Sequence, residues 1–307
     1  QANAFTSHVT MKAGTGGSLA FNDITFVDST DVKLHSSAAS AGDLFIDAGT
    51  NLAVGGDLSI TATNGDITQS GVLTITGAAT FITATTSKNI ILDQNNEFAS
   101  SVTMKAGTGG SDAFNNITFV DTNGVDLVSS TPSAGDLFID ASTDLDVDGA
   151  LIITATTGNI TQGSELAVGT TSTFTTSASD GTITLNDADN TFTGAVALNT
   201  NGSSGNATIK DKAADLQLAA SSVGGALIAT ATTGNITQTG ALDIEGVTTL
   251  VTSGPGADID LAANGTGNAF TGKLLITTNE TSSNAKDAYV TIHGGTTDLK
   301  IGLSTIE

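Results

Sequence analysis

The sequence repeats itself, and this repeat limits the possible folds more than any other feature. A shift of 93 residues lays Ala4–Gln69 over Glu97–Gln162 with 46 identities in 66 positions. The next step, from TATTGNITQ at Thr154 to the same motif at Thr230, is shorter, so the third unit is shorter than the first two. Such a period is typical of stacked units, each of which buries its apolar face against its neighbours. The repeats cover residues 4–96, 97–189, 190–267 and, in part, 268–307.

Within each repeat, apolar residues alternate with polar ones over three to five positions, as at Leu58 and Ile60. This period of two predicts short β-strands, and the Gly, Asn, Asp and Ser clusters between them predict turns. Equivalent positions also recur after 21 residues, as from Ile46 to Ile67, which indicates one coil. We therefore expect an all-β fold, a parallel β-helix (β-solenoid) of about 13 to 15 coils of roughly 20 to 23 residues, continuous over residues 1–307. A β-sandwich, the alternative, gives no reason for a repeat of 93 residues.

The charge and composition exclude several classes of protein. The chain of 307 residues has 9 lysines, no arginine, 26 aspartates, 5 glutamates and a formal net charge of −22. Nucleic acid is therefore not an expected partner, because its binding depends on basic side chains. There is no cysteine, so disulfides and thiolate metal sites are excluded. No apolar run reaches the roughly 18 residues that a membrane-spanning helix requires.

All twelve phenylalanines occupy repeat-equivalent positions, which favours packing over catalysis or ligand stacking. Phe45 and Phe138 differ from the others, because each lies between two inward residues and so points outward. We expect the loop 12–23, which carries Phe21, to fold over this position, and Phe114 to do the same in the second repeat. A lateral contact with another molecule is the alternative.

Aspartates provide the best candidates for a metal site. Asp144, Asp146 and Asp148 are two residues apart, so a strand would turn them to one side as a row of carboxylates suited to Ca²⁺. Asp187 and Asp189 form a second close pair. A solvated face near a turn is the interpretation we favour, because the first repeat has no aspartate at the equivalent positions 51, 53 and 55. No cofactor is otherwise expected.

Polysaccharide lyases and hydrolases also use parallel β-helices, so catalysis has to be weighed. Lyases that act on acidic sugars need basic side chains, and glycoside hydrolysis needs two carboxylates at a defined separation. Sugar clefts usually carry aromatic platforms. The chain has no arginine, no tryptophan and one tyrosine, Tyr289. We therefore expect no enzyme and no catalytic residue.

The segment TATTGNITQTGALDIEG (Thr230–Gly246), followed by NAFTG at Asn268, resembles the repeats of filamentous-haemagglutinin-like exoproteins and other giant bacterial surface adhesins. The resemblance is one of repeat style and extends over Ala4–Glu307. It implies a right-handed parallel β-helix that forms the shaft of a secreted or surface-attached fibre, and it implies no catalytic residues.

These observations together predict a non-catalytic structural shaft of an extracellular bacterial adhesin or surface filament. The expected partners are further copies of the chain, stacked head to tail or laterally, or the rest of a longer polypeptide. A host or neighbouring-cell surface is a further expected partner. The alternative function is that of a carbohydrate-binding or polysaccharide-degrading β-helix protein.

Overall fold

The structure is a computed structural model, and it describes residues 3–11, 23–34, 43–46, 52–106, 115–127, 136–139, 145–262, 267–278, 288–290 and 305–306. The chain divides into two compact units, unit 1 (Gln1–Thr156) and unit 2 (Thr157–Glu307). The described residues form β-strands and turns, with no helix. Consequently no helix able to cross a membrane occurs among them.

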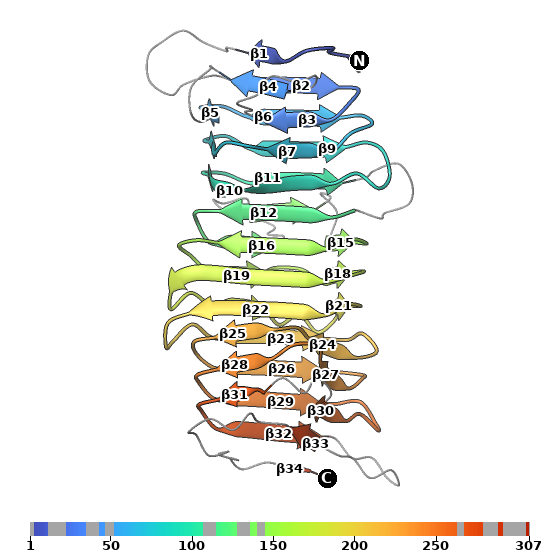
Figure 1. Ribbon diagram of the computed structural model, residues 1–307, viewed down its shortest axis with the longest axis vertical. Helices are drawn as coiled ribbons and strands as arrows, with labels where there is room; N and C mark the ends of the chain where they lie inside the picture. The colour runs from blue at the N-terminus through green and yellow to red at the C-terminus, as the bar shows by residue number, and fades with distance from the viewer. Residues whose placement is uncertain are drawn as a thin grey trace. The chain divides into compact units, whose positions relative to one another are not determined.

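The described part of unit 1 holds strands β1 to β16, and that of unit 2 holds β17 to β34 (Figure 1). In unit 1 they are β1 (Val9–Met11), β2 (Ile24–Asp28), β3 (Val32–Leu34), β4 (Asp43–Ile46), β5 (Leu52–Val54), β6 (Leu58–Ala62), β7 (Ile67–Gln69), β8 (Leu73–Ile75), β9 (Ala79–Thr83), β10 (Ile90–Phe98), β11 (Val102–Ala106), β12 (Ile117–Asp121), β13 (Val125–Leu127), β14 (Asp136–Ile139), β15 (Leu145–Val147) and β16 (Leu151–Ala155). In unit 2 they are β17 (Ile160–Gln162), β18 (Leu166–Val168), β19 (Ser172–Ser179), β20 (Ile183–Leu185), β21 (Thr191–Phe192), β22 (Val196–Asn201), β23 (Ala207–Asp211), β24 (Leu216–Leu218), β25 (Ser221–Val223), β26 (Leu227–Ala231), β27 (Ile236–Gln238), β28 (Leu242–Ile244), β29 (Thr248–Thr252), β30 (Ile259–Leu261), β31 (Ala269–Phe270), β32 (Leu274–Thr278), β33 (Ala288–Val290) and β34 (Thr305–Ile306).

Strands of unit 1 pair in parallel with strands one turn further along the chain. One column runs through β2, β6, β9 and β11, and its residues in register are Ile24, Leu58, Ala79 and Val102. The column continues to β13 through β14, which pairs with both β11 and β13 and so lies between them. The step from β2 to β6 is longer than the two that follow it. Strand β4 is inserted in the same way as β14, because it pairs with both β1 and β3. Parallel pairing with the next turn is the arrangement expected of a solenoid.

Unit 2 has the same organisation. One column runs through β17, β20, β23, β26, β29, β32 and β34. From β17 to β32 its residues in register are Ile160, Ile183, Ala207, Leu227, Thr248 and Leu274. Its steps are similar in length, and the longest is the last, from Thr277 of β32 to Thr305 of β34. The prediction of a parallel β-solenoid is thus confirmed.

The number of turns is smaller than the sequence predicted. The solenoid has about 9 turns. The expectation of about 13 to 15 coils is wrong, because it applied the 21-residue spacing to the whole chain. Turns that include a long loop are longer, as hydrogen bonds between neighbouring turns show. Asp23 Oδ1 accepts the N–H of Asp57, 34 residues further on, and Asp31 Oδ1 accepts the N–H of Asp66, 35 residues further on.

The 93-residue repeat is not a whole number of turns. Strands β2 and β12 are equivalent by sequence, but they lie in different columns. Ile24 of β2 pairs with Leu58, whereas Ile117 of β12 lies between Ile90 and Leu151 in register. One repeat therefore advances the chain by several turns and a fraction, and each side of the solenoid combines strands from different positions of the repeat.

The core is an apolar column inside the turns. In unit 1, Ile60, Phe81 and Met104 lie in register and are fully buried. In unit 2, Leu185 and Ile209 also lie in register and are fully buried. Each such side chain contributes about 1.5–3 kcal/mol relative to exposure. Because alternate residues face inward, even a three-residue strand supplies two core side chains.

Phenylalanine pairs follow the repeat in unit 1. The rings of Phe5 and Phe26 stack with centroids 5.4 Å apart, and those of Phe98 and Phe119 stack at the same distance one repeat later. Phe98 and Phe119 have no exposed surface. The predicted packing role is confirmed for these four rings.

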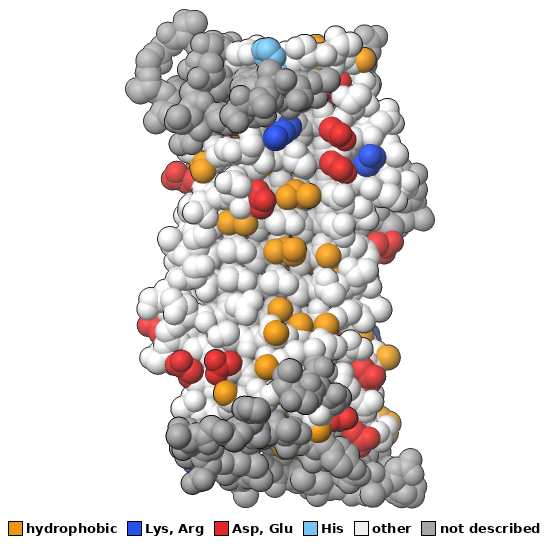
Figure 2. Space-filling view, in the orientation of Figure 1, with side chains coloured by type: hydrophobic (Ala, Val, Ile, Leu, Met, Phe, Trp, Pro, Cys, Tyr) orange, Lys and Arg blue, Asp and Glu red, His pale blue; other side chains and the backbone are white. Residues whose placement is uncertain are grey.

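The described surface has few large apolar side chains. Ile152 of unit 1 is 38% exposed, and Ile228 and Val247 of unit 2 are 41% and 39% exposed. On the face shown in Figure 2, apolar side chains lie among uncharged polar ones, and acidic side chains are more frequent than lysines. The outward positions of the strands are thus mainly polar, as the alternation predicts.

Three expectations about organisation stay predictions: one continuous solenoid over 1–307, the four repeat ranges and the right-handed sense of coiling. The boundary between the two units falls inside the second repeat, 97–189.

Candidate functional site

Three pairs of amide side chains recur at equivalent turns, and all six are buried except Gln162, which is half-buried. Each pair joins the glutamine of an I-T-Q strand to the asparagine of an N-x-F motif further along the chain. In unit 1, Gln69 Nε2 donates to Asn96 Oδ1 at 2.7 Å, and Asn96 Nδ2 donates to Gln69 Oε1 at 3.0 Å. The equivalent pairs of unit 2 are Gln162–Asn190, with distances of 2.8 and 2.9 Å, and Gln238–Asn268, with 3.1 and 2.8 Å. We call each pair, with the backbone groups that it binds, an amide corner.

An amide corner also joins the backbones of neighbouring turns. Asn96 Oδ1 accepts the N–H of Leu73 at 3.0 Å, and Asn96 Nδ2 donates to the carbonyl of Val120 at 3.1 Å. In unit 2, Asn190 Nδ2 donates to the carbonyl of Lys210 at 3.3 Å. Buried amides are costly unless their donors and acceptors are used. The corner therefore favours one register between turns over its alternatives.

A buried aspartate ends the second strand after each of three N-x-F motifs. The three are Asp28, Asp121 and Asp211, and none has exposed surface. The N–H of Phe98 donates to Asp121 Oδ1 at 3.3 Å, and the N–H of Phe192 donates to Asp211 Oδ1 at 3.0 Å. Burial raises the pKa of Asp121 to about 6 and raises the pKa of Asp211, and hydrogen bonds from backbone N–H groups offset part of each change.

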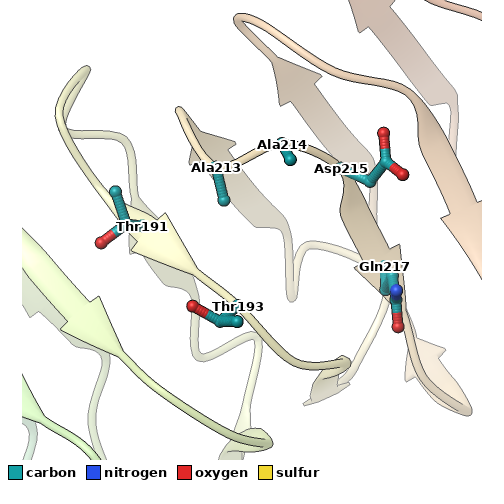
Figure 3. Close-up of a pocket in the computed structure, with 6 residues that line it drawn as sticks. All are labelled: Thr191, Thr193, Ala213, Ala214, Asp215 and Gln217. Carbon is teal, nitrogen blue, oxygen red and sulfur yellow. The ribbon is translucent and has the colours of Figure 1, made fainter.

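An open groove lies on the surface of unit 2 next to the corner of Asn190 (Figure 3). Its volume is about 410 Å³, and its lining residues are Thr191, Thr193, Ala213, Ala214, Asp215 and Gln217. The two threonines flank buried Phe192, which turns both outward. Figure 3 shows the threonines on one side, Asp215 and Gln217 on the other, and the alanines between them. The alanines belong to the turn between β23 and β24.

The groove presents hydroxyl, carboxylate and amide groups and no aromatic ring. Asp215 Oδ1 accepts the N–H of Asn235 at 2.8 Å, which orients this carboxylate. Beside the groove, Lys212 Nζ lies 2.7 Å from Asp189 Oδ1, and this contact raises the pKa of Lys212. The carboxylate of Asp187 accepts the N–H of Asp189 at 2.9 Å, so this predicted pair is used within its own turn. With one titratable residue in its lining, the groove suits hydrogen bonding better than acid–base catalysis.

Comparison with known proteins identifies the repeat. A family model described as "Repeats of unknown function (DUF5649)" matches residues 41–105, 115–199 and 204–277, which is more than half of the chain. The chain belongs to this family. Each of the three DUF5649 matches contains one complete glutamine–asparagine pair of an amide corner, so the corner is a feature of the repeat in this chain. No curated protein and no solved structure matches the chain.

The predicted calcium residues lie in the second DUF5649 match. Asp144 is outside the described residues. Asp146 is half-buried on β15 and Asp148 is exposed, while Val147 between them is buried, so the two carboxylates leave the chain on the outer side. Within the described ranges, no group of three His, Asp or Glu side chains could hold a metal ion. Calcium binding by Asp144, Asp146 and Asp148 stays a prediction.

The predicted aromatic contact also lies largely outside the described residues. This applies to Phe21 and Phe114 as a whole. Phe45 and Phe138 lie on β4 and β14, whose backbones pair in register with β1 and β11, but their side chains are not among those described. The loop packing or lateral contact of these four rings stays a prediction.

The sequence interpretation missed the amide corners and the buried aspartates, although a signal was present. In the I-T-F-V-D strand of the second DUF5649 match, Ile117 and Phe119 face inward, so alternation places Asp121 inward as well. Gln69 and Asn96 likewise stand at positions that recur with their motifs. A polar residue that returns at an inward position indicates a buried hydrogen-bond network.

Proposed function

We propose that this chain of DUF5649 repeats is a non-catalytic structural shaft segment of an extracellular bacterial adhesin or surface filament. The observation that carries the proposal is the parallel register in both units, which gives successive turns the same backbone pairing and a continuous buried column. Such an array gains length turn by turn without a large globular core. The resemblance of Thr230–Gly246 to filamentous-haemagglutinin-like repeats supports the extracellular bacterial setting.

Side chains at the turns add to the ladder between neighbouring turns. In unit 1, Asp57 Oδ1 accepts the N–H of Ala78 at 2.8 Å. In unit 2, Asn206 Oδ1 accepts the N–H of Ala226 at 2.7 Å. These contacts give the excess of aspartate a structural use, because a short side chain at a turn reaches the backbone of the adjacent turn. A pulling force would be shared by the ladder, these contacts and the apolar column.

The negative charge suits a shaft that has to remain dispersed. With a net charge of −22, copies repel one another unless divalent cations screen or bridge them. The proposed partners are further copies, stacked head to tail or laterally, or the rest of a longer polypeptide, together with a host or neighbouring-cell surface. The proposal assigns no catalytic residue, no cofactor and no nucleic-acid partner.

A length series tests the shaft. A second copy of residues 97–189 inserted in tandem should add three to four turns, and so roughly 15–19 Å, to the particle. Negative-stain electron microscopy or small-angle X-ray scattering measures this increase against the parent chain. A particle that grows in all dimensions, or does not grow, would contradict a shaft.

Immunogold labelling tests the extracellular placement. Labelling of intact cells that produce the chain is the expected result, and labelling only after lysis would count against a surface filament. Electron microscopy of the purified chain at rising concentration tests head-to-tail assembly, for which particles of constant length would be the opposing result.

The groove of unit 2 favours carbohydrate binding as a second candidate function. Its threonine hydroxyls, the carboxylate of Asp215 and the amide of Gln217 are groups that hydrogen-bond sugar hydroxyls. A glycan array with the parent chain and Asp215→Ala tests this function, and binding that the substitution weakens is the expected result. Equal binding by the parent chain and Asp215→Ala would exclude the groove as the binding site. A reducing-sugar assay would reveal any hydrolysis.

A further inference from the structure

The three equivalent buried aspartates differ in what their second carboxylate oxygen contacts. At Asp28, Oδ1 accepts the N–H of Ser29 at 2.6 Å, and Oδ2 accepts the hydroxyl of Thr30 at 3.2 Å. The residue two positions after the aspartate supplies this hydroxyl. It is Asn123 in the second repeat and Ala213 in the third, and neither has a hydroxyl group.

Asp121 in unit 1 has an oxygen without a donor. Its side chain is fully buried, and its Oδ2 has no hydrogen-bond partner among the described residues. Asn123 does not replace the missing hydroxyl, because its Nδ2 donates to the carbonyl of Phe98 at 3.3 Å. The strands paired with β12, which are β10 and β16, supply no positive charge that would stabilise the anion of Asp121. The negative charge of Glu97 on β10 raises the pKa of Asp121 further. Asp93 of β10 is exposed, and β16 carries no charged residue.

Asp211 in unit 2 repeats this arrangement. Its Oδ1 accepts the N–H groups of Phe192 and Ala213, both at 3.0 Å, while its buried Oδ2 has no partner in the described part of the chain. The strands paired with its own, β20 and β26, carry no charged residue. Asp215 beyond the turn disfavours the anion, and Lys212 is exposed and paired elsewhere.

A buried carboxylate oxygen without a donor is unfavourable as an anion, whereas a protonated carboxyl carries no charge to desolvate. We propose that Asp121 and Asp211 are internal proton-binding sites, one in each unit, which take up a proton on Oδ2 in mildly acidic medium and thereby stabilise the turns that they join. The direction of the pKa change at both residues agrees with this geometry. The proposal does not depend on the shaft function.

A proton should bind the folded chain more tightly than the unfolded chain. At Asp121, the pKa of about 6 against the ordinary value of 3.8 corresponds to roughly 160-fold tighter binding. The folded state therefore gains stability from this residue as the pH falls through 6 and loses it as the pH rises.

A carbon-13 NMR titration of the full chain, labelled at the aspartate carboxyl carbon, tests the proposal directly. Two carboxyl signals should titrate above the ordinary aspartate value of 3.8, that of Asp121 near pH 6, and Asp121→Asn and Asp211→Asn should each remove one of them. If the signals that the two substitutions remove titrate with the bulk of the aspartates, the proposal is overturned. The parent chain alone gives this result, so it does not depend on a variant that folds.

A matched pair of substitutions tests why the proton binds. Ala213→Thr supplies the hydroxyl that Thr30 gives to Asp28, and it should lower the titration midpoint of Asp211 by about one pH unit or more. Ala214→Thr places the same side chain at the neighbouring exposed position and should leave the midpoint unchanged. If Asp211 titrates with the same midpoint in Ala213→Thr and Ala214→Thr, the missing hydroxyl is not the reason why Asp211 binds a proton.

Discussion

Replacement of Asn96 by alanine should cost far more stability than a surface change of the same size. The Asn96 side chain is fully buried and joins Gln69, the N–H of Leu73 and the carbonyl of Val120. Alanine removes all of these hydrogen bonds at once, and it leaves the partner groups in the amide corner without them.

The magnitude follows from the number of groups left unpaired. A buried donor or acceptor without a partner costs about 1–3 kcal/mol. Two of the donors that lose their acceptor are Gln69 Nε2, at 2.7 Å, and the N–H of Leu73, at 3.0 Å. These two groups predict a loss of about 2–6 kcal/mol. Water that enters the vacated space would recover part of it, so we expect about 2–4 kcal/mol.

Equilibrium urea unfolding followed by far-UV circular dichroism measures this loss. Asn95→Ala, at the adjacent exposed position, is the control and should change stability by no more than about 0.5 kcal/mol. If unfolding proceeds in several steps, hydrogen exchange of the peptides around Leu73 and Val120 gives the local value. The double variant with Gln69→Ala should cost less than the sum of the single changes, because both remove the same bonds. Equal stability of Asn96→Ala and Asn95→Ala would refute a stabilising role for the corner.

Three further predictions concern packing, backbone fit and pH. Phe98→Ala removes a buried ring stacked on Phe119 and should cost about 3–5 kcal/mol in the same urea assay, a result that a change below about 1 kcal/mol would exclude. Gly234→Ala would force its Cβ against the backbone carbonyl of Ala214 and should cost about 3 kcal/mol. Gly256→Ala, at a position with open space but a φ of +83°, should cost about 1–2 kcal/mol. A lower melting temperature for Gly256→Ala than for Gly234→Ala would contradict the backbone geometry. Because burial raises the pKa of Asp121 from 3.8 to about 6, its stabilising contribution is fully present below pH 3.8 and is lost by about pH 6, a change of about 3 kcal/mol that Asp121→Asn should remove from the stability–pH profile.

The fold could be predicted from the sequence because burial in each strand is decided by its own residues. Leu58 and Ile60 alternate with polar neighbours, and this alone places them inward on β6. The 21-residue spacing also gave the correct register of Ile60 on Phe81. It failed for Ile46, which pairs with Met11 and not with Ile67. It also failed for the step from Ile24 to Leu58, where a long loop lengthens the turn. Loop length leaves no periodic signal, so the number of turns could not be derived.

The site was less accessible to sequence reasoning, because it depends on which turns become neighbours. Gln69 and Asn96 are 27 residues apart, and their contact requires the turns on which they lie to be adjacent. Among the residues that the structure describes, Asp211 Oδ2 has no partner because Ala213 has no hydroxyl. This absence is recognised only by comparison with Asp28, whose Oδ2 accepts the hydroxyl of Thr30. Composition drew attention to the exposed aspartates, whereas the informative ones are buried.

Loop length and the amide corner vary independently in this chain. The turn from Asn116 to Ala150 spans 34 residues, whereas the equivalent turn from Asn206 to Ala226 spans 20. Each of the two turns nevertheless opens with a strand whose backbone accepts a hydrogen bond from a corner asparagine. The groove of unit 2 lies along the shorter turn, on the segment between β23 and β24. A framework that tolerates a difference of this size can change its surface without changing its register. Differences in recognition between DUF5649 repeats are therefore expected in the loops, and differences in stability at the corners.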